Sequence, residues 1–224
     1  TPLLARVNAA DRAASRGVLS SAAMVDLYAQ FWASDAYEAA DKLRARQLRV
    51  AYAGANEGQR IEAMRQLWES PNAYGRKVLT AYASARFPVS ADRADDAADL
   101  IASMLAAGLD RNALQWAQVV PEGSHAWGML ALAQPVRANP VSDAAIESFV
   151  DGDDSEDQRR SAFLLAGLAA LDRVGAEELA ALSEDLNVNF SRRSPWSDKI
   201  SRAAQLNNPG LVALLAGLGM QGSS

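Results

Sequence analysis

Apolar residues recur along this chain at intervals of three and four positions, the spacing that places side chains on one face of an α-helix. The clearest stripes are Ile61, Met64, Leu67 and Trp68; Tyr74, Val78, Leu79, Tyr82 and Ala83; Ala97, Leu100, Ile101, Met104 and Leu105; and Phe163, Leu164, Gly167, Leu168 and Leu171. Residues 187–190 form the only stretch that we predict to be extended, and it is too short to found a sheet. The pattern therefore predicts an all-α protein.

Capping residues divide these stripes into short helices. Side chains of Ser, Asn and Asp accept hydrogen bonds from free N–H groups at helix starts, and Gly favours helix ends. We predict starts at Asn56, Ser70, Asp110, Ser142, Ser155, Ser194 and Asn208, and ends at Gly108 and Gly175. Ser155 with Gln158 predicts a capping box. We predict a helical hairpin over residues 57–87, which contain two of the apolar stripes.

The connections between predicted helices are short, which favours antiparallel neighbours. We expect stacked antiparallel helix pairs, arranged as a solenoid-like divergent helical repeat or as an irregular helical bundle. Residues 164–168 and 214–218 share the string Leu-Leu-Ala-Gly-Leu, but the intervals between such strings are unequal. We predict one helical array over residues 1–224, with a soft subdomain boundary near residues 135–157, where prolines and acidic residues gather.

The composition narrows the class of protein. Hydrophobic residues make up 50% of the chain but aromatic ones only 7%, so we expect helices to approach one another over small residues. A formal charge of -5 argues against a nucleic-acid surface, which needs a positive groove. The longest apolar run, residues 210–220, is shorter than the roughly 18 to 20 residues that cross a bilayer, so we predict no membrane span.

Other features of the composition concern the origin of the chain. Only three of its 22 basic residues are lysines, and this bias together with abundant Ala is typical of a GC-rich bacterial genome. The absence of Cys excludes a disulfide framework and Cys-based zinc sites but leaves cytoplasmic and periplasmic locations open. The chain begins at Thr1 and stops just after an apolar helix predicted over residues 209–219. We therefore expect a longer precursor and a continuation of the natural protein.

Residues 151–157 are nearly all acidic and invite comparison with a calcium site, since hard cations prefer several carboxylate oxygens. An EF-hand loop beginning at Asp151 would need Gly at its sixth position and Glu at its twelfth, where this chain has Glu156 and Ala162. We interpret the segment as an acidic helix start, which the helix dipole favours, and we assign no metal ligand.

The segment 121–128 contains the only His of the chain, His125, beside Ser124 and Trp127. A nucleophilic Ser needs a base and an orienting acid in a fixed geometry, which immediate sequence neighbours rarely achieve. We instead predict that Ser124 caps the next helix and that Trp127 packs on it. No catalytic residue and no cofactor is assigned.

Two arginines precede a predicted helix start at residues 191–196. Free N–H groups and the helix dipole favour an anion at such a start. Arg192, Arg193 and Ser194 are therefore the candidate contacts for a phosphate or carboxylate ligand.

The pair Glu69-Ser70 is similar to the Glu-Ser pair of the soluble lytic transglycosylases, in which the Glu is catalytic. Those enzymes also carry a superhelix of Ala-rich helix pairs, which this chain resembles in its helix pairs alone. The Gly-Leu-Met-Gln element that follows the pair in that family is missing after Ser70, so Glu69 is assigned no acid role.

The leading functional hypothesis is a non-enzymatic scaffold that binds a protein or peptide along a groove, because helix pairs are abundant and catalytic residues are few. Aromatic residues on one concave face would serve as anchors for such a partner; the candidates are Trp32, Trp68, Trp116, Trp127, Trp196, Tyr28, Tyr52 and Tyr82. The alternatives are a structural segment of a larger protein, such as a superhelical arm, and a small-anion-binding domain.

Overall fold

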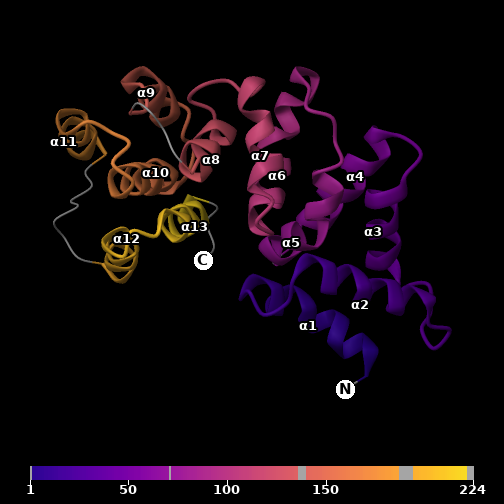
Figure 1. Ribbon diagram of the computed structural model, residues 1–224. Coiled ribbons are helices and arrows are strands. Elements are labelled where there is room, and N and C mark those ends of the chain that lie inside the picture. Colours follow the sequence, from indigo (N-terminus) through magenta and orange to yellow (C-terminus); the bar gives the residue numbers. More distant parts are fainter. Residues whose placement is uncertain (1, 71, 136–139, 187–193, 221–224) are drawn as a thin grey trace. The chain divides into compact units, whose positions relative to one another are not determined.

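The computed structural model describes residues 2–70, 72–135, 140–186 and 194–220 of the chain. Within these residues every regular element is a helix, which confirms the predicted all-α class (Figure 1). The packing of its helix pairs is consistent with a helical bundle or a helical repeat. The extended stretch predicted at residues 187–190 lies outside the described residues.

Thirteen α-helices and three short 3-10 turns follow one another along the described chain. They are α1 (Leu3–Ser15), α2 (Ser21–Ala33), α3 (Leu43–Ala53), α4 (Glu57–Trp68), α5 (Ala73–Ser84), α6 (Ala94–Ala106), α7 (Asp110–Leu114), α8 (His125–Ala133), α9 (Asp143–Asp151), α10 (Arg159–Ala170), α11 (Ala176–Asp185), α12 (Pro195–Gln205) and α13 (Pro209–Met220), with 3-10 turns at Ala91–Arg93, Gln115–Gln118 and Glu156–Gln158.

The chain divides into two compact units. The N-terminal unit comprises residues 1–89 and 99–113, and the C-terminal unit comprises residues 90–98 and 114–224. Helix α6 therefore contributes residues to both units. The predicted soft boundary near residues 135–157 falls within the C-terminal unit and stays a prediction.

In the N-terminal unit, α1 and α2 pack against α5, and α3 pairs with α4. Helices α1 and α5 touch backbone to backbone at Gly75, where an added Cβ would lie 2.2 Å from the carbonyl oxygen of Asp11. Only glycine permits so close a crossing. The buried side chains of this unit include Val7, Met24, Tyr28, Phe31, Leu48, Ile61, Met64, Leu67 and Leu79, with Leu100 and Met104 from α6.

In the C-terminal unit, α13 packs against α8, α10 and α12. These contacts also depend on glycines. A Cβ at Gly219 would lie 2.2 Å from the ring of Phe163, and one at Gly167 would lie 2.6 Å from Leu132 and 2.7 Å from Ala216. Such contacts in both units confirm the expectation that helices approach one another over small residues.

Several predicted caps are confirmed. Asn56, Ser124 and Asn208 each accept a hydrogen bond from the backbone N–H three residues later, over 2.9, 3.1 and 3.0 Å. Gly108 follows α6 with a left-handed φ of +72°, and the N–H of Leu109 donates to the carbonyl of Met104. This hydrogen bond closes the helix in the manner of a Schellman motif. Residues 57–87 do contain a helical hairpin, α4 and α5.

Three helix boundaries differ from the prediction. Ser155 and Gln158 form no capping box, because Gln158 has a left-handed φ of 47° and α10 begins only at Arg159. Helix α10 ends at Ala170 and is followed by Asp172 with a φ of 55°, so Gly175 instead precedes α11. The sequence predicts Ser70 as the cap of the helix that follows it, but α5 begins at Ala73 and its N-cap residue is Asn72.

Membrane-crossing helices need both length and apolarity. No helix in the described ranges combines the two.

Candidate functional site

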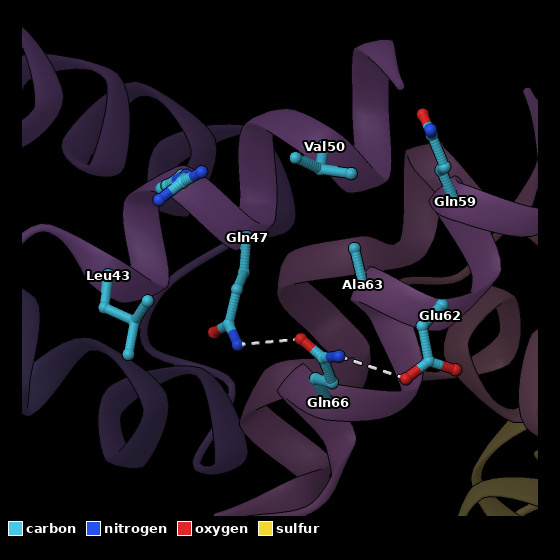
Figure 2. Close-up of a pocket in the computed structure, with 8 residues that line it drawn as sticks. Leu43, Gln47, Val50, Gln59, Glu62, Ala63 and Gln66 are labelled. Atoms are coloured by element: carbon cyan, nitrogen blue, oxygen red, sulfur yellow. Dashed lines mark hydrogen bonds between the residues drawn. The ribbon is translucent and has the colours of Figure 1, made fainter. Parts of the chain in front are cut away.

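A pocket of about 310 Å³ lies between α3 and α4 (Figure 2). Helix α3 lines it with Leu43, Arg46, Gln47 and Val50, and α4 lines it with Gln59, Glu62, Ala63 and Gln66. On each helix these residues are three, four and seven positions apart, so they share one helix face. The pocket is therefore formed where one face of α3 meets one face of α4.

The pocket combines an apolar base with an amide rim. Its apolar lining residues are Ala63, which is buried, Val50, which is half-buried, and Leu43, which is 54% exposed. Across the rim, the amide of Gln47 donates to the side-chain oxygen of Gln66 over 3.1 Å. The amide of Gln66 donates in turn to Glu62, one turn earlier on α4, over 3.0 Å. Figure 2 shows both hydrogen bonds: the first joins α3 to α4, and the second lies within α4.

The two charged residues that line the pocket, Glu62 and Arg46, differ in their contacts. Glu62 lies 3.9 Å from the guanidinium of Arg65 and accepts the hydrogen bond from Gln66. Arg46 is exposed, and within the described part of the chain it has no ion-pair partner. The pocket thus presents one cation whose charge is not neutralised by the protein.

A second polar cluster is buried in the same unit. The guanidinium of Arg76, on α5, lies 2.6 Å from the carboxylate of Asp11, on α1, and donates to the hydroxyl of Tyr28, on α2, over 2.9 Å. Arg44, on α3, approaches Asp11 at 3.9 Å. The cluster therefore joins four helices.

Burial controls the ionisation of this cluster. It raises the pKa of Asp11 above its ordinary value, although the charges of Arg76 and Arg44 oppose the shift. Burial also raises the pKa of Tyr28. Asp11 Oδ1 and Arg76 Nε are buried without a hydrogen-bond partner among the described residues, but Arg76 contacts both Asp11 and Tyr28. We therefore interpret the cluster as a structural element that fixes how the helices pair.

A hydroxyl network lies between α4, α5 and α6. The hydroxyl of Thr80 accepts a hydrogen bond from the indole of Trp68 over 2.9 Å and lies 3.1 Å from the hydroxyl of Ser103. Ser103 donates to the carbonyl of Lys77 over 2.7 Å. These bonds satisfy polar groups that are otherwise buried, which is also a structural role.

The predicted anion site is only partly described. Arg192 and Arg193 lie outside the described residues. Ser194 caps α12, since its hydroxyl accepts a hydrogen bond from the N–H of Ser197 and the hydroxyl of Ser197 accepts one from the N–H of Ser194. The cap at Ser194 is confirmed, and its role toward an anion stays a prediction.

The segment around His125 has the predicted local structure. The hydroxyl of Ser124 accepts the hydrogen bond from the N–H of Trp127 and so caps α8. Trp127 is buried, and the rings of His125 and Trp127 lie 6.5 and 6.4 Å from that of Phe149. Trp127 and Phe149 are therefore packed core side chains, and the half-buried His125 lies beside them.

The acidic segment 151–157 places one carboxylate at a helix start. Asp153 accepts hydrogen bonds from the N–H and hydroxyl of Ser161 over 2.8 and 2.6 Å, and from the N–H and hydroxyl of Ser155. Partial burial opposes the ionisation of Asp153, but these hydrogen bonds together hold its pKa below the ordinary value. No group of three or more His, Asp or Glu side chains among the described residues is arranged to hold a metal ion.

The other predicted candidates do not assemble into a site. Glu69 is exposed at the end of α4, and the N–H of Ser70 donates to the carbonyl of Trp68. Four of the eight aromatic candidates for anchors, Trp68, Trp116, Trp127 and Tyr28, are buried core residues. In the N-terminal unit Trp32 is 36% exposed and Tyr82 is 45% exposed.

The pocket residues were missed by the sequence analysis. A signal for them did exist: α3 carries Arg44, Arg46 and Arg49 but no acidic residue, although the chain as a whole has a net charge of -5. Comparisons of the chain with protein-family models, with curated proteins and with solved structures found no match.

Proposed function

We propose that this chain is a non-enzymatic helical scaffold that binds a peptide segment in the pocket between α3 and α4. The observation that supports the proposal is the combination of an apolar base with exposed amides at the rim. Amide side chains donate and accept hydrogen bonds, as the peptide backbone does, and can pair with it. Apolar pockets with a few polar groups are the usual form of ligand sites.

The size of the pocket favours a single inserted side chain. About 310 Å³ is near the lower limit of small-molecule pockets, which enclose most of their ligand. A peptide needs to insert only one anchor, while its backbone remains on the surface between the two helices. The described lining residues also lack the His, Cys or paired carboxylates that acid–base or nucleophilic catalysis would use.

The proposal is tested with an array of immobilised octapeptides in which each apolar residue stands at the centre of a Gly/Ser sequence. The best binder is then titrated in solution by fluorescence anisotropy. The variant Gln66→Trp, at an exposed lining position, covers the pocket and is expected to weaken binding at least about tenfold. Ala53→Trp, at an exposed position of α3 outside the pocket, is the matched control and is expected to bind normally.

Circular dichroism of both variants checks that they fold like the natural sequence. Failure of every octapeptide to bind would overturn the proposal. Equal binding by the two Trp variants would show that peptides bind elsewhere and would overturn it as well.

A separate observation favours the second candidate, a structural segment of a larger protein. Helix α13 carries no charged residue, and Leu211 and Leu214 on it are 37% and 46% exposed. Helices that are apolar all round are usually covered by other elements. This candidate predicts no saturable binding in the titration, and dye binding to exposed apolar surface that the double variant Leu211→Gln/Leu214→Gln lowers.

A further inference from the structure

Helix α3 is a basic helix in an acidic chain. Its sequence, residues 43–53, contains three arginines and no Asp or Glu, whereas the chain has 27 acidic and 22 basic residues. Lys42, directly before α3, is four positions from Arg46 and seven from Arg49, so these three cations share one helix face. One edge of the pocket therefore has a positive ridge.

The arginines of α3 differ in what they contact. Arg44 donates to the side chain of Asn8 and forms an ion pair with Asp11, so it interacts with α1 of the same unit. The guanidinium of Arg49 lies 5.1 Å from the centre of the Trp32 ring, a cation–π contact. Arg46 alone among these three lines the pocket.

On the opposite edge of the pocket, Glu62 lies 3.9 Å from the guanidinium of Arg65 and accepts a hydrogen bond from the amide of Gln66. Arg46 has no such partner in the described part of the chain. The α3 edge of the pocket therefore offers an arginine to an anionic group on a ligand. Arginine presents a planar set of donors that matches the two oxygens of a carboxylate.

We infer that the pocket between α3 and α4 binds an acidic peptide, whose apolar side chain enters between Leu43, Val50 and Ala63 while an adjacent carboxylate pairs with Arg46. The inference rests on the proposed function and adds the class of peptide. The apolar side chain provides burial, and the carboxylate determines which peptides bind, because charged rim contacts act mainly on specificity and association rate. Lys42 and Arg49 extend the attraction along the same ridge.

The test uses three fluorescein-labelled peptides, Gly-Ser-X-Leu-X-Ser-Gly with X as Asp, Asn or Lys, titrated against the full chain by anisotropy. The Asp peptide is expected to bind about three- to tenfold more tightly than the Asn peptide, and the Lys peptide more weakly still. The preference should shrink as NaCl is raised, because salt screens exposed charges.

Arg46→Gln is expected to remove the preference for Asp over Asn, and Arg46→Glu to reverse it in favour of Lys. Arg49→Gln is the matched control, since it removes an equal charge from the same helix at a position that does not line the pocket. It should keep most of the preference.

The outcomes separate the inference from the proposed function. If all three peptides bind equally and Gln66→Trp still blocks them, the acidic specificity is wrong and the peptide scaffold stands. If Arg46→Gln and Arg49→Gln reduce the preference equally, the carboxylate does not pair with Arg46 and the inference falls. If none of the three peptides binds while an array octapeptide does, the inference alone falls. If no peptide of either set binds, both fall.

Discussion

The two units of this chain stabilise their interiors in different ways. The N-terminal unit buries an ion pair, Asp11 with Arg76, together with the hydroxyl network of Thr80. In the C-terminal unit the buried Arg173 donates to the carbonyl groups at the end of α8, where the helix dipole favours a cation. The remaining interior of that unit is largely apolar and packed over glycines.

Helices made mostly of Ala and Leu need some further feature to select their partners. Apolar stripes alone allow alternative pairings of similar energy. A buried ion pair penalises every arrangement that leaves one charge unmatched, and this is our hypothesis for the N-terminal unit. A glycine contact acts differently. In any other pairing of the helices, the backbones would not come close together at the glycine, and the packing contacts made there would be lost.

Breaking the ion pair is expected to give the largest effect. Arg76→Met leaves the buried carboxylate of Asp11 without its partner at 2.6 Å and should destabilise the protein by about 3 to 5 kcal/mol. The measurement is the free energy of unfolding in urea, followed by circular dichroism.

The double variant Asp11→Leu/Arg76→Met serves as the control. It removes both charges and should recover most of the lost stability, since apolar replacement of a whole buried pair is often neutral. Simple additivity of the single effects of Asp11→Leu and Arg76→Met would contradict the coupling.

Filling the glycine contacts is expected to give the next largest effect. Gly75→Ala forces a methyl group against the backbone of Asp11, which cannot yield, and should cost about 3 kcal/mol or more. Gly219→Ala meets the side chain of Phe163, which can move, and should cost about 1 to 3 kcal/mol. Thermal unfolding of each variant measures the difference.

Gly217→Ala is the matched control on α13, because a Cβ there meets nothing within 4 Å. It should stabilise the protein by about 0.5 to 1 kcal/mol through helix propensity. If Gly217→Ala and Gly219→Ala behaved alike, the close packing of α13 on α10 would be refuted.

The two units should also respond differently to removal of an indole N–H. The indole of Trp68 donates to Thr80, whereas the buried Nε1 of Trp196 has no hydrogen-bond partner among the described residues. Trp68→Phe should therefore cost about 1 kcal/mol more than Trp196→Phe in urea unfolding. Equal losses would mean that the hydroxyl network adds nothing to the N-terminal unit.

The smallest expected effect is a difference in pH dependence. The pKa of Asp11 is raised above 3.8 in the folded protein, so the native state binds this proton more readily than the unfolded chain. The natural sequence should therefore gain stability relative to Asp11→Asn as the pH falls from neutrality toward 3.8.

Asp153 should show the opposite sign, because its pKa is lowered below 3.8. Its contribution is present above 3.8 and is lost as the pH falls through the folded value. Urea unfolding of both Asn variants down to about pH 2.5 compares the two. If the natural sequence lost stability relative to Asp11→Asn on acidification, the raised pKa of Asp11 would be contradicted.

The helices and many of their caps were predictable because the signals are local. Asn56, Ser124 and Asn208 act on an N–H three residues away, within reach of propensity and spacing. The predicted capping box of Ser155 with Gln158 is wrong because Asp157 and Gln158 take left-handed conformations that no periodicity reports. The N–H groups at the start of α10 donate instead from Arg160 to the hydroxyl of Ser155 and from Ser161 to Asp153.

The candidate site was not predictable in the same way. The pocket requires that the Leu43–Val50 face of α3 meet the Gln59–Gln66 face of α4 at one register. A stripe of apolar and amide residues on a helix does not say which neighbour faces it. The basic character of α3 was visible in the sequence, but which of its arginines lacked a partner depended on the positions of Asp11 and Trp32.

By itself the sequence determined that this protein is helical, where several of its helices begin, and that small residues would lie between them, because these properties follow from hydrogen bonds and sterics within a few residues. Only the tertiary structure decided that Asp11 meets Arg76 across 65 positions, that Gly75 lies against the backbone of α1, and that Arg46 faces a pocket unpaired. Those outcomes depend on how whole helix faces pack, and packing energy is shared among many residues that are distant in the chain.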